Sequence, residues 1–345
     1  MTLDQIGFYT LSEQRVRQAS ATSPLWRCEL ILTDRCNFQC PYCRGLEPNL
    51  KGDMDLEKAK NLIDYWLSEG LRNVRFSGGE PTLYRPLASL VERCVEGNVE
   101  HIAISTNGSA SYAYYEDLIF SGVNDFSISL DAGCCSIGER MNGGFGKPWE
   151  QSIENIRALS RMTYVTVGMV FNELNVSNCV EAVLLADSLG VADIRVIPAA
   201  QYNKALTMLS VLPTDVLQRH PILRYRIENM KKGCHVRGTN RASCPLVLDD
   251  MAVAGRWHFP CIIYMRERGN PIGEISSNMR RERQTWYEKH NPSQDVICSQ
   301  NCLDVCVAYN DRWDEVHLGI SPERVGTLKG QLKGEPRAFG GLLAL

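Results

Sequence analysis

An α/β fold built around an open parallel barrel is predicted by three features of the sequence. Between Trp26 and Ile197, six apolar stretches with strand character alternate with stretches of helical periodicity. Their spacing is close to the roughly 30 residues that a strand–helix unit needs. Polar residues follow several of the strand stretches directly, and after Pro198 the alternation stops. Six units are too few to close a full barrel, so the sequence predicts a partial (β/α)6 barrel.

The first half of the barrel is predicted from strand, cap and helix signals in turn. The apolar stretch 26–33 leads into a cysteine-rich loop. Asp55 has the short polar side chain of a helix N-cap, apolar residues recur at helical spacing as far as Leu67, and Gly70 ends the helix. The next predicted elements are a strand at 74–76, a helix at 87–96, a strand at 101–105 and a helix at 112–120.

The second half of the barrel repeats this pattern. A strand at 125–130 ends at Asp131, and Pro148 occupies the first turn of the next helix. The remaining predicted elements are a strand at 164–171, a helix at 176–189 and a strand at 193–197. The carboxyl ends of parallel barrel strands share one edge, where such folds hold their active sites. We therefore expect four polar segments to meet there: the cysteine loop, Gly78-Gly79-Glu80, Thr106-Asn107-Gly108 and Asp131.

Composition excludes several classes of protein. The chain has 345 residues, of which 44% are hydrophobic, and a formal net charge of −3, so its surface as a whole is not built to attract nucleic acid. Residues 1–25 lack the apolar core of a signal peptide, and no apolar run reaches the ~20 residues that span a membrane. We therefore expect a cytoplasmic location, where the 14 cysteines indicate metal binding rather than disulfides.

The chain is expected to divide into three parts. Residues 1–25 form a polar N-terminal arm, residues 26–205 form the barrel, and residues 206–345 form a smaller, cysteine-rich domain. The arm has about 25 residues, which is too few to fold a domain of its own.

Three cysteines fall within eight residues, at Cys36, Cys40 and Cys43, with the spacing CxxxCxxC. A [4Fe–4S] cluster has four irons and usually four thiolate ligands, so a loop with three thiols leaves one iron open to another ligand. Zinc is the alternative, since paired cysteines often bind it. Zinc needs a fourth ligand nearby, and the next cysteine or histidine in the chain is Cys94. An iron–sulfur cluster is therefore favoured.

The motif resembles that of the radical S-adenosylmethionine (SAM) enzymes. In that family the open iron binds the amino and carboxylate groups of SAM. An electron from the reduced cluster then cleaves SAM to a 5′-deoxyadenosyl radical, which takes hydrogen from unactivated C–H bonds. The resemblance implies a partial TIM-like barrel, a [4Fe–4S] cluster and SAM as cofactors, and an external electron donor of the flavodoxin or ferredoxin type.

The resemblance also implies which residues contact SAM. The segment Gly78-Gly79-Glu80 follows the second strand, as does the family motif that binds the SAM amino group, with Glu80 either accepting from the ammonium or bracing the loop. Ser129 and Asp131 match the ribose-binding position, although Asp131 is also typical of a helix N-cap. Tyr42 matches the aromatic position near adenine. Weaker candidates are Asn107, Met169 and Ile197, the last two being more typical of an apolar core.

Six cysteines lie beyond the barrel: Cys234, Cys244, Cys261, Cys298, Cys302 and Cys306. The segment from Cys244 to Cys261 resembles the start of the SPASM/Twitch extension, in which paired cysteines flank a hairpin. Six thiols support one four-iron cluster with two to spare. A second, auxiliary [4Fe–4S] cluster is therefore predicted, and a structural zinc at the same thiols is the alternative. The favoured ligands are Cys244, Cys261, Cys302 and Cys306, with Cys298 or Cys234 as substitutes.

Two further features bear on the substrate. Residues 224–283 carry 12 basic and 6 acidic residues with aromatic residues between them. Such a stretch is typical of a solvated structural face, or of a site for an anionic substrate such as a nucleotide, a modified nucleic-acid base or a phosphorylated metabolite. Cys134 and Cys135 follow Asp131, where a thiol would face the barrel mouth and return a hydrogen atom to a product radical. Two buried structural cysteines are the more common interpretation.

The sequence therefore predicts a radical SAM enzyme that abstracts hydrogen from an anionic small molecule, a nucleotide or a nucleic-acid base. The expected outcome is rearrangement, epimerisation or oxidation. Two alternatives remain open. The first is a maturase of ribosomal peptides, which would need a separate leader-binding partner because the N-terminal arm is too short to supply one. The second is a zinc-binding regulator without enzymatic activity.

Overall fold

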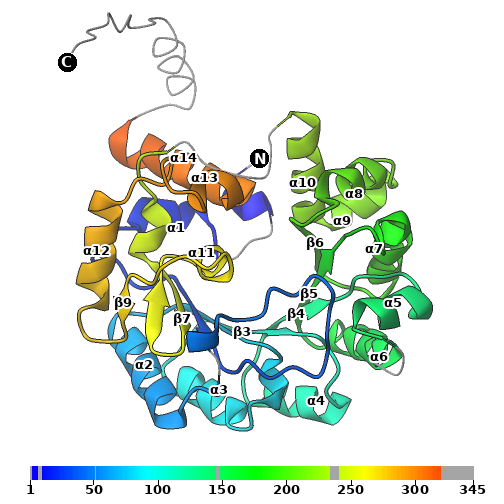
Figure 1. The fold of residues 1–345 in the computed structure, drawn as a ribbon, viewed down its shortest axis with the longest axis horizontal. Helices are drawn as coiled ribbons and strands as arrows, with labels where there is room; N and C mark the ends of the chain where they lie inside the picture. Colours follow the sequence, from blue (N-terminus) through cyan, green and yellow to red (C-terminus); the bar gives the residue numbers. More distant parts are fainter. Residues whose placement is uncertain (1, 7–9, 51, 145–147, 234–240, 320–345) are drawn as a thin grey trace, which may run out of the picture.

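A computed structural model describes residues 2–6, 10–50, 52–144, 148–233 and 241–319. Within these residues, nine strands form a single sheet in the order β6-β5-β4-β3-β2-β1-β7-β8-β9. The six strands of the predicted barrel are β1 (Arg27–Ile31), β2 (Asn73–Ser77), β3 (His101–Thr106), β4 (Asp125–Ser129), β5 (Tyr164–Val170) and β6 (Asp193–Ile197). Each pairs in parallel with the next, and the sheet curves without closing on itself (Figure 1).

Helices cover the outer face of these strands (Figure 1). They are α2 (Leu56–Ser68), α3 (Leu87–Glu96), α4 (Tyr112–Phe120), α5 (Cys135–Met141), α6 (Trp149–Leu159), α7 (Cys179–Ser188), α8 (Tyr202–Leu209), α9 (Thr214–Arg219) and α10 (Pro221–Lys231). Asp55 caps α2 by accepting from the Lys58 amide at 3.0 Å. The main hydrophobic core lies between sheet and helices and joins Leu30 and Phe76 of the strands to Trp66 of α2. The predicted partial (β/α)6 barrel is confirmed.

The C-terminal part of the chain extends the same sheet. Its elements are β7 (Asp250–Ala254), β8 (Trp257–Phe259), α11 (Ile262–Arg266), β9 (Gly273–Glu274), α12 (Met279–Lys289), α13 (Cys298–Asn301) and α14 (Asp304–Leu318). Strand β7 pairs in parallel with β1, and β8 turns back antiparallel to β7 through Gly255, whose φ is 58°. This hairpin lies between Cys244 and Cys261, where the resemblance places one. Among the described residues, no helix is both long enough and apolar enough to cross a bilayer.

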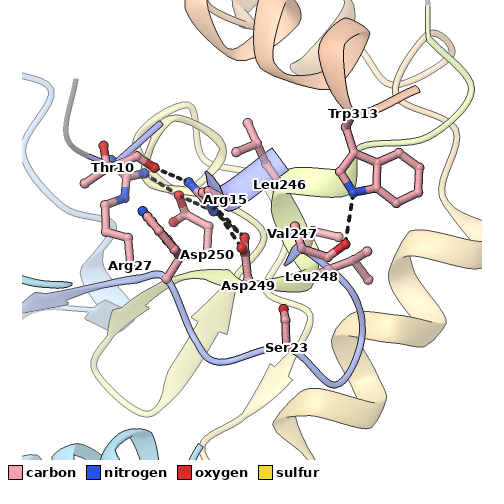
Figure 2. A network of polar contacts seen from close by, with 12 residues as sticks. Thr10, Arg15, Ser23, Arg27, Leu246, Val247, Leu248, Asp249, Asp250 and Trp313 are labelled. Carbon is pink, nitrogen blue, oxygen red and sulfur yellow. Dashed lines mark hydrogen bonds and ion pairs between the residues drawn. The ribbon is translucent and has the colours of Figure 1, made fainter. Parts of the chain in front are cut away.

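The N-terminal arm packs on the C-terminal elements instead of leading loosely into the barrel. Its helix α1 (Glu13–Gln18) lies beside α14 (Figure 1), and Val16 shares a small hydrophobic core with Tyr309 and Trp313. Arg15 is fully buried, with its Nε 3.0 Å from Asp249 Oδ2 (Figure 2). Short 3-10 helices complete the fold at Leu3–Ile6, Pro48–Leu50, Pro81–Leu83, Val176–Asn178 and Pro245–Leu248.

Candidate active site

The loop that follows β1 brings Cys36, Cys40 and Cys43 together. Cys36 and Cys43 are exposed, and Cys40 is half-buried. The Cys43 amide donates to the Cys40 carbonyl at 3.0 Å, so the chain turns tightly between these two residues. The thiols of Cys36 and Cys40 both lie close enough to the Cys43 thiol for their charges to interact. One short loop thus presents three thiols as a group.

The surroundings of these thiols fit an iron–sulfur cluster. Burial raises the pKa of Cys36, and it raises the pKa of Cys40 to about 12, so metal binding has to displace protons here. Nitrogen donors face the Cys36 sulfur, with the Phe38 amide at 3.4 Å and the Asn107 side-chain nitrogen at 3.9 Å. Hydrogen bonds to ligand sulfurs are one of the means by which proteins tune cluster potentials. Phe38 is itself buried and anchors the loop.

The glycine segment after β2 packs directly against the start of the cysteine loop. The Gly79 amide donates to the Thr33 carbonyl, and the Glu80 amide donates to the Arg35 carbonyl, both at 2.7 Å. A Cβ atom on Gly79 would lie 2.3 Å from the Arg35 carbonyl oxygen. Because real Cβ contacts are much longer, only glycine permits this approach of the two backbones.

Replacing Gly79 with alanine is therefore expected to separate the two loops. We expect SAM to bind at least about tenfold more weakly to the reconstituted protein, and the free energy of unfolding to fall by about 1–3 kcal/mol. Equilibrium dialysis with SAM and urea unfolding measure the two effects. Gly168→Ala is the matched control, since its new methyl group would meet only the movable end of the Ile197 side chain, at 3.3 Å. Equal effects from both variants would contradict the prediction.

Glu80 holds the loops at the ends of β2 and β3 together. It is buried, and its Oε1 accepts from the hydroxyl groups of Thr82 and Thr106 at 2.7 Å each. Its Oε2 accepts from the Asn107 amide at 2.7 Å, and burial raises the pKa of the carboxyl. The Asn107 side chain in turn donates to Asn37 Oδ1 at 2.9 Å. These bonds favour the bracing role for Glu80 over direct contact with the SAM ammonium.

Asp131 and Tyr42 meet across the barrel edge. The Tyr42 hydroxyl donates to Asp131 Oδ2 at 2.5 Å, and the Val170 amide donates to Oδ1 at 2.7 Å. Burial raises the pKa of Asp131 to about 6. The contact fixes the cysteine loop over the end of β4, where Ser129 is exposed. The two residues that the resemblance assigns to the ribose and adenine positions are therefore neighbours.

The raised pKa of Asp131 predicts a pH dependence of stability. Its ordinary pKa is 3.8, so between about pH 4 and 6 the folded state holds a proton that the unfolded state has lost. The contribution of protonated Asp131 to the free energy of unfolding is therefore complete below pH 4 and is lost as the pH rises through about 6. This contribution is about 3 kcal/mol at most. Asp131→Asn should remove the Asp131 contribution to this slope and leave that of Asp193, whose pKa burial raises to about 7. Urea unfolding of the metal-free protein at pH 4.5 and pH 7 measures it, and parallel pH curves for parent and variant would contradict the assignment.

A cavity of about 320 Å3 lies inside the barrel. Side chains alternate between the two faces of a strand. Every second residue faces the hydrophobic core beneath the helices, and the residues between them point into the barrel. Ile197, at the end of β6, and Thr10 and Leu11 of the N-terminal arm also line the cavity. The polar strand residues that line it are Arg27, Glu29, Arg75, Asp125, Thr166, Arg195 and Asp250.

Each of the three cavity arginines is oriented by a neighbour. Arg27 is paired with Asp250 at 2.7 Å, Arg75 with Asp125 at 3.7 Å, and Arg195 donates to Thr166 at 3.0 Å. Figure 2 shows Arg27 and Asp250 beside the buried pair of Arg15 and Asp249. These arginines were not among the residues predicted from the sequence. The available signal was the alternation of charged and apolar residues within a strand, as in Arg27, Cys28, Glu29 and Leu30.

Five cysteines of the C-terminal part line the same cavity: Cys244, Cys261, Cys298, Cys302 and Cys306. Cys302 and Cys306 are hydrogen-bonded to each other, and this bond lowers the pKa of Cys306. Cys298 has polar partners of its own, because its sulfur, the Asp295 carboxylate and the His290 ring lie within 4.8 Å of one another. Cys234 lies outside the described residues. The four thiols favoured from sequence therefore share one space, with Cys298 beside them.

Of the residues predicted for the SAM site, Ile197 lines the cavity, and the cysteine loop, the glycine segment, Asn107, Ser129 and Asp131 do not. Three further candidates also lie away from the cavity. Met169 is fully buried in the main hydrophobic core, on the helix-facing side of β5. Cys134 and Cys135 are half-buried at the start of α5, where the Cys134 sulfur lies 3.7 Å from the Ser136 hydroxyl. Neither cysteine is among the residues that line the cavity. Their position gives no support to the hydrogen-donor role.

The basic stretch at 224–283 is largely used within the fold. Arg283 is fully buried and donates to the Val247 and Phe259 carbonyls at 2.9 and 2.8 Å. Arg280 donates to the Ala21 and Ser23 carbonyls at 2.7 and 2.6 Å. The Arg280 guanidinium thus joins α12 to the N-terminal arm, which favours the structural interpretation for this residue of the stretch. Other arginines of the stretch are in ion pairs: Arg226 with Asp304, Arg241 with Asp311 and Asp314, Arg256 with Glu274, and Arg268 with Glu47.

The fold and the site together define a class of enzymes. Its members have an open parallel barrel with a loop of three thiols at the carboxyl edge of the sheet. Residues 30–186 match the Radical SAM superfamily, so the chain carries a radical SAM domain. This match supports a radical SAM enzyme over the alternative of a non-enzymatic zinc regulator.

Three known proteins show what the chain is similar to. It is 31% identical to the GTP 3′,8-cyclase of Picosynechococcus sp. over 150 residues, which are 41% of this chain and 46% of that protein. Its fold is similar to SuiB of Streptococcus suis bound to the precursor peptide SuiA, with 14% identity, a TM-score of 0.54, and coverage of 77% of this chain and 65% of that one. It is also similar to native anSMEcpe with bound AdoMet (SAM) and Cp18Cys peptide, with 13% identity, a TM-score of 0.52, and coverage of 89% and 99%. The chain spans less than half the length of the cyclase.

Proposed function

We propose that this enzyme cleaves SAM reductively and directs the 5′-deoxyadenosyl radical at a C–H bond of an anionic small molecule in the barrel cavity. The single observation that carries the proposal is that three arginines and five cysteines line one cavity inside the barrel. Guanidinium groups bind phosphate and carboxylate in a bidentate manner. A nucleotide is the favoured substrate class, since the similar GTP 3′,8-cyclase is named for one.

The proposed roles of the chain's own residues follow from their contacts. Cys36, Cys40 and Cys43 would hold the SAM cluster, which when bound supplies the electron that cleaves SAM, replenished by an external flavodoxin- or ferredoxin-like donor. The backbone contact between Gly79 and Thr33 sets the distance between the cysteine loop and the segment that would receive the SAM amino group. The remaining pocket residues would be Tyr42, Gly78, Glu80, Asn107, Ser129, Asp131 and Ile197.

We assign the auxiliary cluster to Cys244, Cys261, Cys302 and Cys306. The fifth thiol, Cys298, lies beside Asp295, and burial together with nearby charges raises its pKa. The Asp295 carboxylate and the His290 ring give the Cys298 sulfur polar partners of its own, which supports leaving Cys298 out of the cluster. Anaerobic reconstitution should yield about eight iron and eight sulfide per chain. About one zinc with four iron would instead support the structural zinc site.

Nucleotide binding tests the substrate class. Reconstituted protein is titrated with GTP, ATP and a nucleoside without phosphate, and 5′-deoxyadenosine formation is followed with each. Arg195→Gln should weaken binding of the preferred nucleotide by about tenfold to a hundredfold, the effect of losing a hydrogen bond to a charged group. Arg256→Gln is the matched control, because Arg256 is 68% exposed and paired with Glu274. Deuterium placed on the nucleotide should appear in 5′-deoxyadenosine.

Other outcomes have a defined meaning. If no nucleotide binds and a short peptide with its leader-binding partner stimulates 5′-deoxyadenosine formation, the peptide maturase is the correct reading. If the nucleoside binds as well as the nucleotide, the cavity arginines do not recognise an anion and the substrate class is wrong.

A further inference from the structure

The short helix α11 joins the two cysteine sites. It begins after Cys261, whose sulfur accepts from the Tyr264 amide at 3.4 Å and lines the cavity with the other C-terminal thiols. It ends at Arg266, in contact with the loops at the barrel edge. A helix of five residues is only about 7.5 Å long. The proposed auxiliary site and the SAM cluster loop are therefore linked by one rigid turn and a half.

Residues 266–268 hold the cysteine loop and the glycine segment at the same time. Arg266 donates to the Gly45 carbonyl at 3.2 Å and to the Gly78 carbonyl at 3.0 Å. Glu267 pairs with Arg44, and Arg268 pairs with Glu47 at 2.8 Å. Of these contacts, only those of Arg266 reach both loops. Its planar guanidinium can serve two carbonyls in a fixed geometry, which an ammonium cannot.

Arg266 also places a positive charge beside the cluster loop. Its guanidinium is half-buried and lies close enough to the Cys43 thiol for their charges to interact. A partly buried charge is less screened by salt than an exposed one. Reduction adds an electron to a cluster, so a nearby cation favours the reduced form and raises the potential.

We propose that Arg266 is a positioning residue of the SAM cluster, which fixes the cysteine loop against the glycine segment and raises the reduction potential of the cluster held there. The proposal rests on the cluster site proposed above. It gives the C-terminal part of the chain a role at the SAM site itself, in addition to the auxiliary thiols. The electron still comes from the external donor, and Arg266 exchanges neither electron nor proton.

The test is a potentiometric titration of the reconstituted holoenzyme. The titration is monitored by the electron paramagnetic resonance signal that changes when SAM is added. Arg266→Gln should lower the midpoint by at least 59 mV, which is a tenfold change in a one-electron equilibrium. Arg268→Gln is the matched control. It removes the same charge two residues further along the chain, where the Arg268 side chain is 75% exposed. It should shift the midpoint by less than a third as much.

A third variant separates charge from geometry. Arg266→Lys keeps the charge and loses the double contact, so it should hold the potential while amide hydrogen exchange of residues 44–47 and 78–80 speeds up several-fold. Faster amide exchange of these residues in both Arg266 variants, but not in Arg268→Gln, would support the positioning role. Equal shifts for Arg266→Gln and Arg268→Gln, or none in either, would overturn the proposal. A parent protein without any SAM-responsive signal would instead overturn the proposed function.

Discussion

Replacing Cys40 with alanine is expected to abolish SAM cleavage. Three thiolates leave one iron of the cube open, and two thiolates hold it too weakly. Iron in the anaerobically reconstituted protein should fall from about eight to about four per chain. The rate of 5′-deoxyadenosine formation with a chemical reductant should fall at least about a thousandfold, which corresponds to about 4 kcal/mol or more in the barrier. Iron analysis and chromatographic detection of 5′-deoxyadenosine measure the two quantities.

Cys134→Ala is the control for iron content, since Cys134 is a half-buried thiol that lies outside both cysteine groups. It should bind as much iron as the parent. If Cys40→Ala cleaves SAM at the parental rate, the open cluster does not lie on this loop. If Cys40→Ala loses all eight irons, the two cysteine sites assemble together, as the link through α11 would allow.

The barrel elements were predictable because their signals are local. Helices α3 and α4 have the bounds predicted from sequence, 87–96 and 112–120, since an apolar stripe and the residues that end it lie within each segment. Asp55 was predictable as a cap for the same reason, because its partner, the Lys58 amide, is three residues away. The polar segments that follow the strands were predicted to meet because parallel strands share one edge.

The contacts that join the N-terminal arm and the C-terminal elements were not predictable, because their partners are far apart in the chain. Arg15 stands in a polar arm, and its partner Asp249 is 234 residues away. Arg283 belongs to a helix whose sequence, MRRERQTWYEK, reads as a solvated surface. Its burial follows from the carbonyl groups of the β7–β8 hairpin, and no pattern in α12 indicates them. The pairing of β7 with β1 is equally non-local.

Arg15→Met is expected to cause a large loss of stability. The guanidinium and the Asp249 carboxylate are both buried, and Arg15 also donates to the Thr10 carbonyl at 2.6 Å (Figure 2). Removing one member of a buried ion pair leaves the other charge uncompensated, at a cost of about 3–5 kcal/mol. Urea unfolding should show this as a lower midpoint with an unchanged slope. The arm that Arg15 anchors lines the cavity through Thr10 and Leu11, so nucleotide binding should weaken as well.

The double variant Arg15→Met/Asp249→Leu distinguishes the cost of a stranded charge from the value of the pair. With both charges replaced by apolar groups, no buried carboxylate remains uncompensated, and buried pairs replaced in this way are often no less stable. The double variant should therefore recover at least about half of the stability lost by Arg15→Met. If it is less stable than the single variant, the pair itself holds the arm on the barrel. In that case the packing of the arm against the barrel depends on the Arg15–Asp249 charge pair. High salt should then have little effect on this packing, because both side chains are out of contact with solvent.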